Sequence, residues 1–134
     1  MKRFFDTNVL VYAFLDGPRR MRAQEALADG GIVSVQVLNE FTNVSRRKHG
    51  REWPEIEAAL DVIRSRLPVV TALTEQTHAA ALALARDHGF AFYDALIVAA
   101  AIEAGCDILL TEDMQHGRTI DALTICDPFR QSAA

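Results

Sequence analysis

Four acidic residues stand beside hydrophobic sequence, whereas most other acids of the chain sit among polar residues. They lie in the segments "RFFD", "VLNEF", "FYDAL" and "LLTED" and are Asp6, Glu40, Asp94 and Asp113. Carboxylates gathered without a cation repel one another, and one or more of them takes up a proton. Because the set offers only oxygen and no histidine falls among the four, it suits Mg²⁺ or Mn²⁺ rather than zinc.

A divalent ion held by carboxylates has a defined chemistry. It orients a phosphodiester, lowers the pKa of a bound water and offsets charge in the transition state. The sequence shows no Ser-His-Asp or Cys-His arrangement and no glycine-rich phosphate loop. The acids therefore favour metal-assisted hydrolysis of a phosphodiester, with one ion or two.

Each acid also has an ordinary structural explanation. Asp6 could cap the helix that follows it. Asp94 could complement the dipole in the first turn of its helix, and Asp113 could organise a turn. Glu40 shares a helical face with polar residues and could simply face water. The residue types alone leave these alternatives open.

Strand and helix signals alternate along the chain, which favours a parallel sheet covered on both faces. Capping residues, Pro54 in a first turn and glycine stops bound the helices. The expected strands are 3–5, 31–34, 67–73, 107–111 and 123–126, and the expected helices are 8–16, 19–31, 35–48, 54–66, 74–89 and 93–105.

In such folds, sites gather at the carboxyl ends of the strands. Asp6 directly follows one predicted strand, and Thr111, Glu112 and Asp113 stand at the end of another. Both acidic segments should then lie on one rim of the sheet. Asp94 opens an apolar helix, so we expect its carboxylate to point inward.

Polar and basic neighbours fit a phosphate substrate. Thr7, Asn8 and Thr111 flank the acids and could hydrogen-bond the carboxylates. The segments "RRMR" at 19–22 and "RRKHGR" at 46–51 could form a basic rim, or simply solvated faces.

Three further residues could meet the substrate itself. His116 and Arg118 follow Asp113 and could reach a phosphate, and Tyr93 could stack on a base.

Bulk composition sets outer limits. A chain of 134 residues suits one domain, and its net charge of −4 argues against broad non-specific binding to nucleic acid. The longest apolar run, residues 95–102, is far shorter than the ~20 residues of a membrane span. Cys106 and Cys126 show no zinc or C-x-x-C spacing, which indicates reduced thiols in the cytoplasm.

Together, "FFDTNVLVYAF", "VLNEFTNV" and "FYDALIVAAAIEAGCDILLTEDM" resemble the PIN-domain family, and within it the VapC toxins of type II toxin–antitoxin systems. The resemblance spans about residues 3 to 127. It implies one PIN domain over 1–134, with a three-layer α/β/α sandwich and a mostly parallel sheet. It also implies a Mg²⁺- or Mn²⁺-dependent endoribonuclease that forms a homodimer. A small antitoxin would occupy a groove and obstruct the acidic site.

The family's four acids fall on Asp6, Glu40, Asp94 and Asp113, and Glu112 could instead supply the fourth oxygen. The family's conserved polar positions fall on Thr111 and Asn8.

Other functions compete with this one. A PIN nuclease that processes RNA would keep the chemistry without the toxin role, and a silent binding module would keep only the fold. A haloacid-dehalogenase phosphatase also begins with a strand and an Asp, but it needs a second Asp where this chain has Asn8. A phospho-receiver domain would need a well-placed lysine, which neither Lys2 nor Lys48 provides.

Overall fold

A six-stranded sheet organises the fold, which a computed structural model describes for residues 1–130. The strand order is β3-β2-β1-β4-β6-β5, and β5 alone runs antiparallel to its neighbour. The strands are β1 (Arg3–Phe5), β2 (Ile32–Ser34), β3 (Val69–Thr71), β4 (Ile108–Leu110), β5 (Thr119–Ile120) and β6 (Leu123–Cys126).

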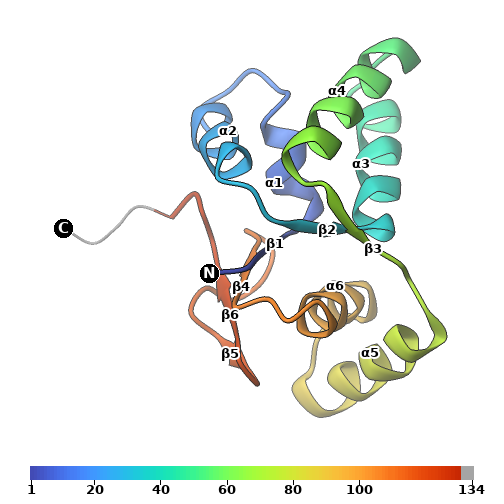
Figure 1. The fold of residues 1–134 in the computed structure, drawn as a ribbon, viewed down its shortest axis with the longest axis vertical. Coiled ribbons are helices and arrows are strands. Elements are labelled where there is room, and N and C mark those ends of the chain that lie inside the picture. The colour runs from blue at the N-terminus through green and yellow to red at the C-terminus, as the bar shows by residue number, and fades with distance from the viewer. Residues whose placement is uncertain (131–134) are drawn as a thin grey trace.

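Helices cover both faces of this sheet. Figure 1 shows α1 to α4 on one side and the antiparallel pair α5 and α6 on the other. The helices are α1 (Thr7–Tyr12), α2 (Arg20–Ala28), α3 (Val35–Arg47), α4 (Trp53–Arg66), α5 (Glu75–His88) and α6 (Phe92–Glu103). The predicted three-layer α/β/α sandwich with a mostly parallel sheet is confirmed.

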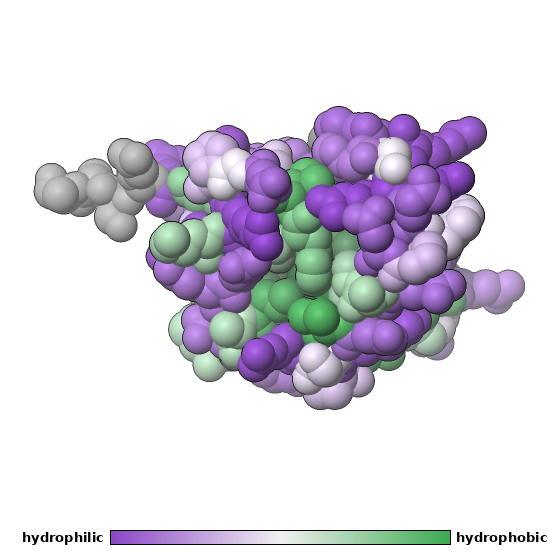
Figure 2. Space-filling model, turned by 90° about the horizontal axis from the view of Figure 1, so that it is seen from above, coloured by the Kyte–Doolittle hydropathy of each residue, from purple (hydrophilic) through white to green (hydrophobic). Residues whose placement is uncertain are grey.

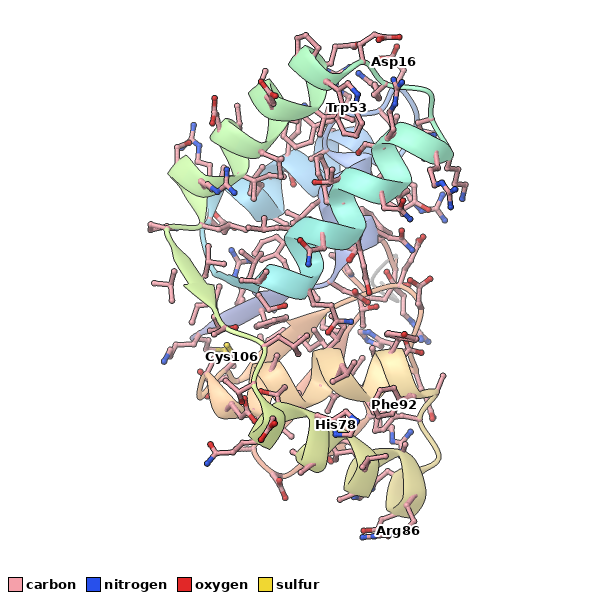
Figure 3. The ribbon with its side chains drawn as sticks, turned by 90° about the vertical axis from the view of Figure 1, so that its right-hand side faces the viewer. Asp16, Trp53, His78, Arg86, Phe92 and Cys106 are labelled. Atoms are coloured by element: carbon pink, nitrogen blue, oxygen red, sulfur yellow. The ribbon has the colours of Figure 1, made fainter. Side chains whose placement is uncertain are left out.

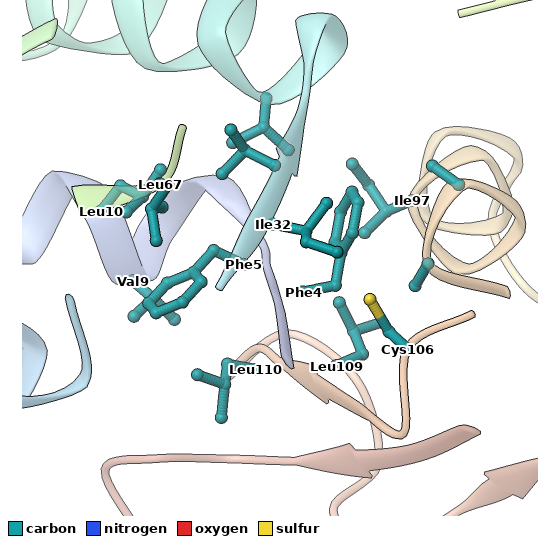
Figure 4. Close-up of a cluster of buried hydrophobic side chains, with 14 of the residues drawn as sticks. Phe4, Phe5, Val9, Leu10, Ile32, Leu67, Ile97, Cys106, Leu109 and Leu110 are labelled. Carbon is teal, nitrogen blue, oxygen red and sulfur yellow. The ribbon is translucent and has the colours of Figure 1, made fainter. Parts of the chain in front are cut away.

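The central strand β1 is anchored by its two phenylalanines, which are fully buried. Successive side chains of a strand point to opposite faces. In Figure 4, Phe4 accordingly lies toward Ile97 of α6, and Phe5 lies toward Val9 of α1. This double burial fixes the end of β1, and with it the residue that follows, Asp6.

The sheet has its topological switch point between β1 and β4. From β1 the chain winds to β2 and β3 on one side, and later to β4 and β6 on the other. Phe5 pairs with Leu110, and the amide of Asp6 donates to the carbonyl of Leu110 at 3.0 Å. Crevices at such switch points, outside the carboxyl ends of the strands, are where open α/β sheets bind ligands.

Several helix boundaries follow the signals in the sequence. Ser34 caps α3, accepting a hydrogen bond from the amide of Val37 at 3.3 Å. Thr74 caps α5, and Pro54 stands in the first turn of α4. On the opposite face, α5 and α6 pack through the buried side chains Ala81, Ala95, Leu96 and Ala99. The rings of His78 and Phe92 also meet between these helices, with centroids 5.6 Å apart (Figure 3).

Several elements differ from the prediction. The helix expected over 19–31 ends at Ala28, before its two glycines, and the strand expected over 67–73 is only Val69–Thr71. The first helix was expected over 8–16, but α1 ends at Tyr12, and the chain continues in tight turns in which Phe14 bonds to Val11 and Leu15 to Tyr12. Strand β5 was not predicted, because two residues carry no periodicity. In the turn from β5 to β6, Asp121 adopts a φ of 51°. This turn lacks the Asn-Gly or Asp-Gly pair from which a hairpin is usually predicted.

Two smaller expectations can also be compared. Cys106 is buried and Cys126 half-buried, and both are free thiols. Among residues 1–130, no helix is long and apolar enough to cross a membrane. The predicted single domain over 1–134 includes residues 131–134, which lie outside the described part of the chain.

Strand β1 passes close to Gly31, the residue before β2, and this contact leads to a prediction about stability. A Cβ on Gly31 would lie 2.7 Å from the carbonyl oxygen of Arg3 and 2.6 Å from the ring of Phe5. We expect Gly31→Ala to lower the free energy of unfolding by about 3 kcal/mol, as overpacking does. Urea denaturation measures this loss.

Gly89→Ala is the matched control. Gly89 has a φ of 74°, but a Cβ there meets nothing within 4 Å. We expect it to lose only about 1 kcal/mol, the cost of a left-handed backbone. An equal loss in the two variants would contradict the steric argument.

Candidate active site

The four acids predicted from the sequence all line one cleft at the switch point. The cleft has a volume of about 170 Å³. It is lined by Asp6, Thr7, Asn8, Glu40, Asn43, Val44, Tyr93, Asp94, Ile97 and Asp113. Segments far apart in the sequence thus deliver carboxylates to one place.

Asp6 is the most buried of the four, with 6% of its surface exposed. Its Oδ1 accepts a hydrogen bond from the amide of Thr7, and its Oδ2 accepts one from the hydroxyl of Thr111, both at 2.7 Å. The first bond makes Asp6 the cap of α1, as one interpretation of the sequence predicted. The cap role and a place in the cleft are therefore compatible.

Burial sets the protonation of Asp6. It raises the pKa to about 6, against the opposing effect of the hydrogen bonds from Thr111 and Thr7. The nearby charges of Asp113 and Glu40 add smaller increases. A carboxyl group held this way loses its proton near neutral pH, and a bound cation would lower the pH at which it does so.

Glu40 is held by two donors rather than left to solvent. The hydroxyl of Thr7 donates to its Oε2 at 2.7 Å, and Nε2 of Gln36 donates to its Oε1 at 3.0 Å. Gln36 is itself buried, and its Oε1 has no hydrogen-bond partner among the described residues. From the sequence, the polar face that Gln36 shares with Glu40 could simply face water, although the spacing of four residues on α3 also allows the two side chains to pair.

Asp94 and Asp113 face the cleft from the other side. Asp113 accepts a hydrogen bond from Nδ2 of Asn8 at 2.7 Å, and its amide donates to the hydroxyl of Thr111 at 3.1 Å. Asp94 stands in the first turn of α6. Burial raises the pKa of Asp94, and the charges of Asp113 and Glu40 raise it further.

No cation of residues 1–130 forms an ion pair with these four acids, and the predicted basic rim is largely engaged elsewhere. Within the described chain, Arg47 and Lys48 are exposed at the end of α3 without an ion pair. The basic segments pair as Arg19–Glu112, Arg20–Asp16, Arg22–Glu25, Arg46–Glu52 and Arg51–Glu55.

The other candidates for substrate contact separate into two groups. His116 accepts a hydrogen bond at Nδ1 from the amide of Asp127, and Arg118 donates to the carbonyl of His88 at 2.6 Å. Neither of these two lines the cleft. Tyr93 does line it and is 70% exposed, so its ring is available to a bound molecule.

The donor set fits a hard divalent cation in its chemistry. Four carboxylates without a basic partner, one of them with a raised pKa, gain from a shared positive charge. As they stand, no three Asp, Glu, His or Cys side chains of residues 1–130 are arranged to hold an ion together. Hydrogen bonds from Thr7, Asn8 and Thr111 hold three of the acids, so these side chains would have to reorient to share an ion.

The comparison with protein families gives a match to the PIN domain over residues 3–121. The chain belongs to the PIN-domain family. PIN domains of this kind are nucleases, and this membership removes the phosphatase and receiver alternatives. No curated protein matches the sequence.

Solved structures with the same fold are VapC toxins and toxin–antitoxin complexes. VapC20 of Mycobacterium tuberculosis, a toxin that cleaves the sarcin-ricin loop, is 20% identical, with a TM-score of 0.69 over 84% of this chain and 92% of that one. A toxin–antitoxin complex from Klebsiella pneumoniae is 20% identical, with a TM-score of 0.72 over 97% and 100%. VapBC2 of Rickettsia felis, bound to promoter DNA, is 25% identical, with a TM-score of 0.67 over 93% and 97%.

The burial of Asp6 predicts how stability depends on pH. Its folded pKa of about 6 lies above the ordinary 3.8, so the carboxyl group favours folding below that range, and this contribution is lost as pH rises through 6. Asp6→Asn removes the ionisation. We expect the free energy of unfolding of the variant to exceed that of the wild type by about 3 kcal/mol at pH 7 in metal-free buffer. Urea denaturation should show the difference vanishing near pH 4.

Thr111→Val is the opposing control. It removes the hydroxyl that donates to the Asp6 carboxylate and leaves the side-chain volume nearly unchanged. It should therefore destabilise the protein more at pH 7 than at pH 4. A stability difference between Asp6→Asn and wild type that is independent of pH would contradict the raised pKa.

Proposed function

We propose that this protein is a Mg²⁺- or Mn²⁺-dependent endoribonuclease that acts as the toxin of a VapBC-type pair. The observation that carries the proposal is the cleft at the switch point between β1 and β4. Four carboxylates meet there without a basic partner in the described chain. In a PIN domain, that arrangement serves hydrolysis of a phosphodiester better than any other chemistry the residues offer.

The roles follow from the contacts. Asp6, Glu40, Asp94 and Asp113 would hold the ion, which when bound supplies an activated water and offsets charge on the phosphate. Thr7, Asn8 and Thr111 orient the carboxylates by donating hydrogen bonds to them. The exposed ring of Tyr93 at the rim of the cleft suits stacking on a base of the RNA.

Cleavage of RNA tests the nuclease claim. We expect Asp6→Asn and Asp94→Asn each to lower kcat by about 100-fold or more. A residue that only orients a metal ligand commonly costs about 10–100-fold, and a ligand itself should cost at least as much. EDTA should abolish cleavage by the wild type, and Mn²⁺ should restore it. The readout is the initial rate on total RNA, with cleaved ends mapped by sequencing.

Asp61→Asn is the matched control, because Asp61 is an exposed acid of α4 outside the cleft. It should cleave at the rate of the wild type. Full cleavage by Asp6→Asn, or cleavage that survives chelation, would contradict the metal site. Active enzyme that leaves growth unaffected would contradict the toxin role and favour a PIN nuclease of RNA processing.

An antitoxin partner is the second part of the proposal. A groove of about 250 Å³ runs between α2 and α4, and Figure 2 shows an apolar band between hydrophilic rims on this face. Its lining is Ala13, Phe14, Gln24, Leu27, Ala28, Val62 and Arg66. An amphipathic helix lays its apolar face into a groove of this kind. The similar structures are a toxin–antitoxin complex from Klebsiella pneumoniae and VapBC2 from Rickettsia felis, so we assign the groove to a segment of an antitoxin.

A charged residue introduced into this groove should abolish inhibition by the antitoxin without changing nuclease activity. We expect Val62→Glu to retain nuclease activity and toxicity but to escape inhibition by the proposed antitoxin. A charged side chain beneath the docked segment must be desolvated, which opposes docking even with Arg66 four residues further along α4. Leu82→Glu is the control, since Leu82 is about equally exposed but lies on α5 across the sheet. Full inhibition of the Val62→Glu variant would place the partner elsewhere.

The remaining assignments rest on the same family. We propose a homodimer in the cytoplasm and one PIN domain for the whole chain. In support of the last point, β6 follows the matched region and still pairs with β4 in the sheet.

A further inference from the structure

Glu112 points away from the acidic cleft, although it stands next to Asp113. Its Oε1 accepts a hydrogen bond from the hydroxyl of Tyr12 at 2.5 Å, and its Oε2 accepts one from Nε of Arg19 at 3.0 Å. Both oxygens are thus engaged by residues from the end of α1 and the start of α2. Glu112 is also absent from the lining of the cleft.

Aromatic packing completes this contact. The guanidinium of Arg19 lies 5.4 Å from the ring centre of Tyr12 and 5.7 Å from that of Phe129. The rings of Tyr12 and Phe129 meet edge to face at 5.3 Å. With its side chain only 16% exposed, Glu112 is better shielded than a surface ion pair. The contact joins α1, the segment before α2, the loop after β4 and the chain after β6.

We propose that Tyr12, Arg19 and Glu112 form a clamp that positions Asp113, which leaves Asp113 as the fourth acid of the proposed site. Glu112 is therefore a positioning residue that acts through its neighbour. The catalytic consequence rests on the proposed function, whereas the effect of the clamp on the loop does not.

The loop itself explains why a clamp is needed. Residues 112–118 contain no helix or strand, so little backbone pairing holds Asp113 in place. Asp113 is exposed, and its carboxylate is held from within the described chain by Asn8 alone. Anchoring the preceding residue at both carboxylate oxygens restricts the backbone from which Asp113 projects. Outer partners of this kind commonly change metal affinity or activity by about 10–100-fold.

Tyr12→Phe and Glu112→Gln test the clamp, with Arg86→Gln as control. Arg86 forms an exposed ion pair at the far end of α5 (Figure 3). In the protein without metal or RNA, we expect amide hydrogen exchange over residues 112–116 to speed up in both clamp variants, while exchange in β1 and α6 stays unchanged. Arg86→Gln should leave the exchange of this loop as in the wild type.

Two further readouts follow the effect to the site. Titration with Mn²⁺ alone, followed by electron paramagnetic resonance, should show affinity about 10-fold weaker in each clamp variant. In cleavage assays, kcat should fall by a similar factor while KM changes little. Tyr12→Phe combined with Glu112→Gln should be no worse than the more damaging single change, because both break one unit.

The opposite assignment makes a different prediction for Tyr12→Phe. If Glu112 were the ligand, freeing it from Tyr12 would leave Mn²⁺ affinity unchanged or strengthen it, and that result would overturn the proposal. Unchanged exchange over 112–116 would overturn it as well. If the clamp variants loosen the loop but Asp6→Asn still cleaves RNA, the proposed function fails and the clamp stands.

Discussion

A single buried carboxylate, that of Asp6, is the constraint on which the site depends. It stands at the end of a strand whose two phenylalanines are fully buried, so packing on both faces of the sheet holds the backbone beneath it. One of its oxygens caps α1 through the amide of Thr7, and the other receives the hydroxyl of Thr111, which follows β4. Strand pairing, helix start and acidic cleft therefore meet at one residue.

The same arrangement works against stability. Carboxylates that share a cleft repel one another, and burial raises the pKa of both Asp6 and Asp94. The fold tolerates this through hydrogen bonds from neutral donors, which orient the acids without cancelling their charge. If an arginine replaced these neutral donors, it would form a stable ion pair with the acids, and a divalent cation would find their charge already neutralised. Carboxylates without a basic partner, carried on a backbone that the sheet holds in place, are thus what the proposed chemistry requires.

Much of this could be predicted from the sequence, because strand ends and helix caps are local signals. Asp6 follows a short apolar strand and precedes a helix, so its place on the rim followed from the alternation of elements. The partners of the acids could not be predicted in the same way. The contact of Glu112 with Tyr12 spans 100 positions, and Gln36 looks like a solvent-facing residue until α3 packs against α1. Side-chain direction in a loop depends on packing that no periodicity encodes.

The central claim is that the four acids form a cation site, and manganese located in crystals tests it most directly. Crystals soaked in Mn²⁺ and measured at the manganese absorption edge should show anomalous density in the cleft bounded by Asp6, Asp94 and Asp113. Crystals of Asp6→Asn treated in the same way should show none there. Wild-type crystals with an empty cleft, or with manganese bound only outside it, would contradict the account.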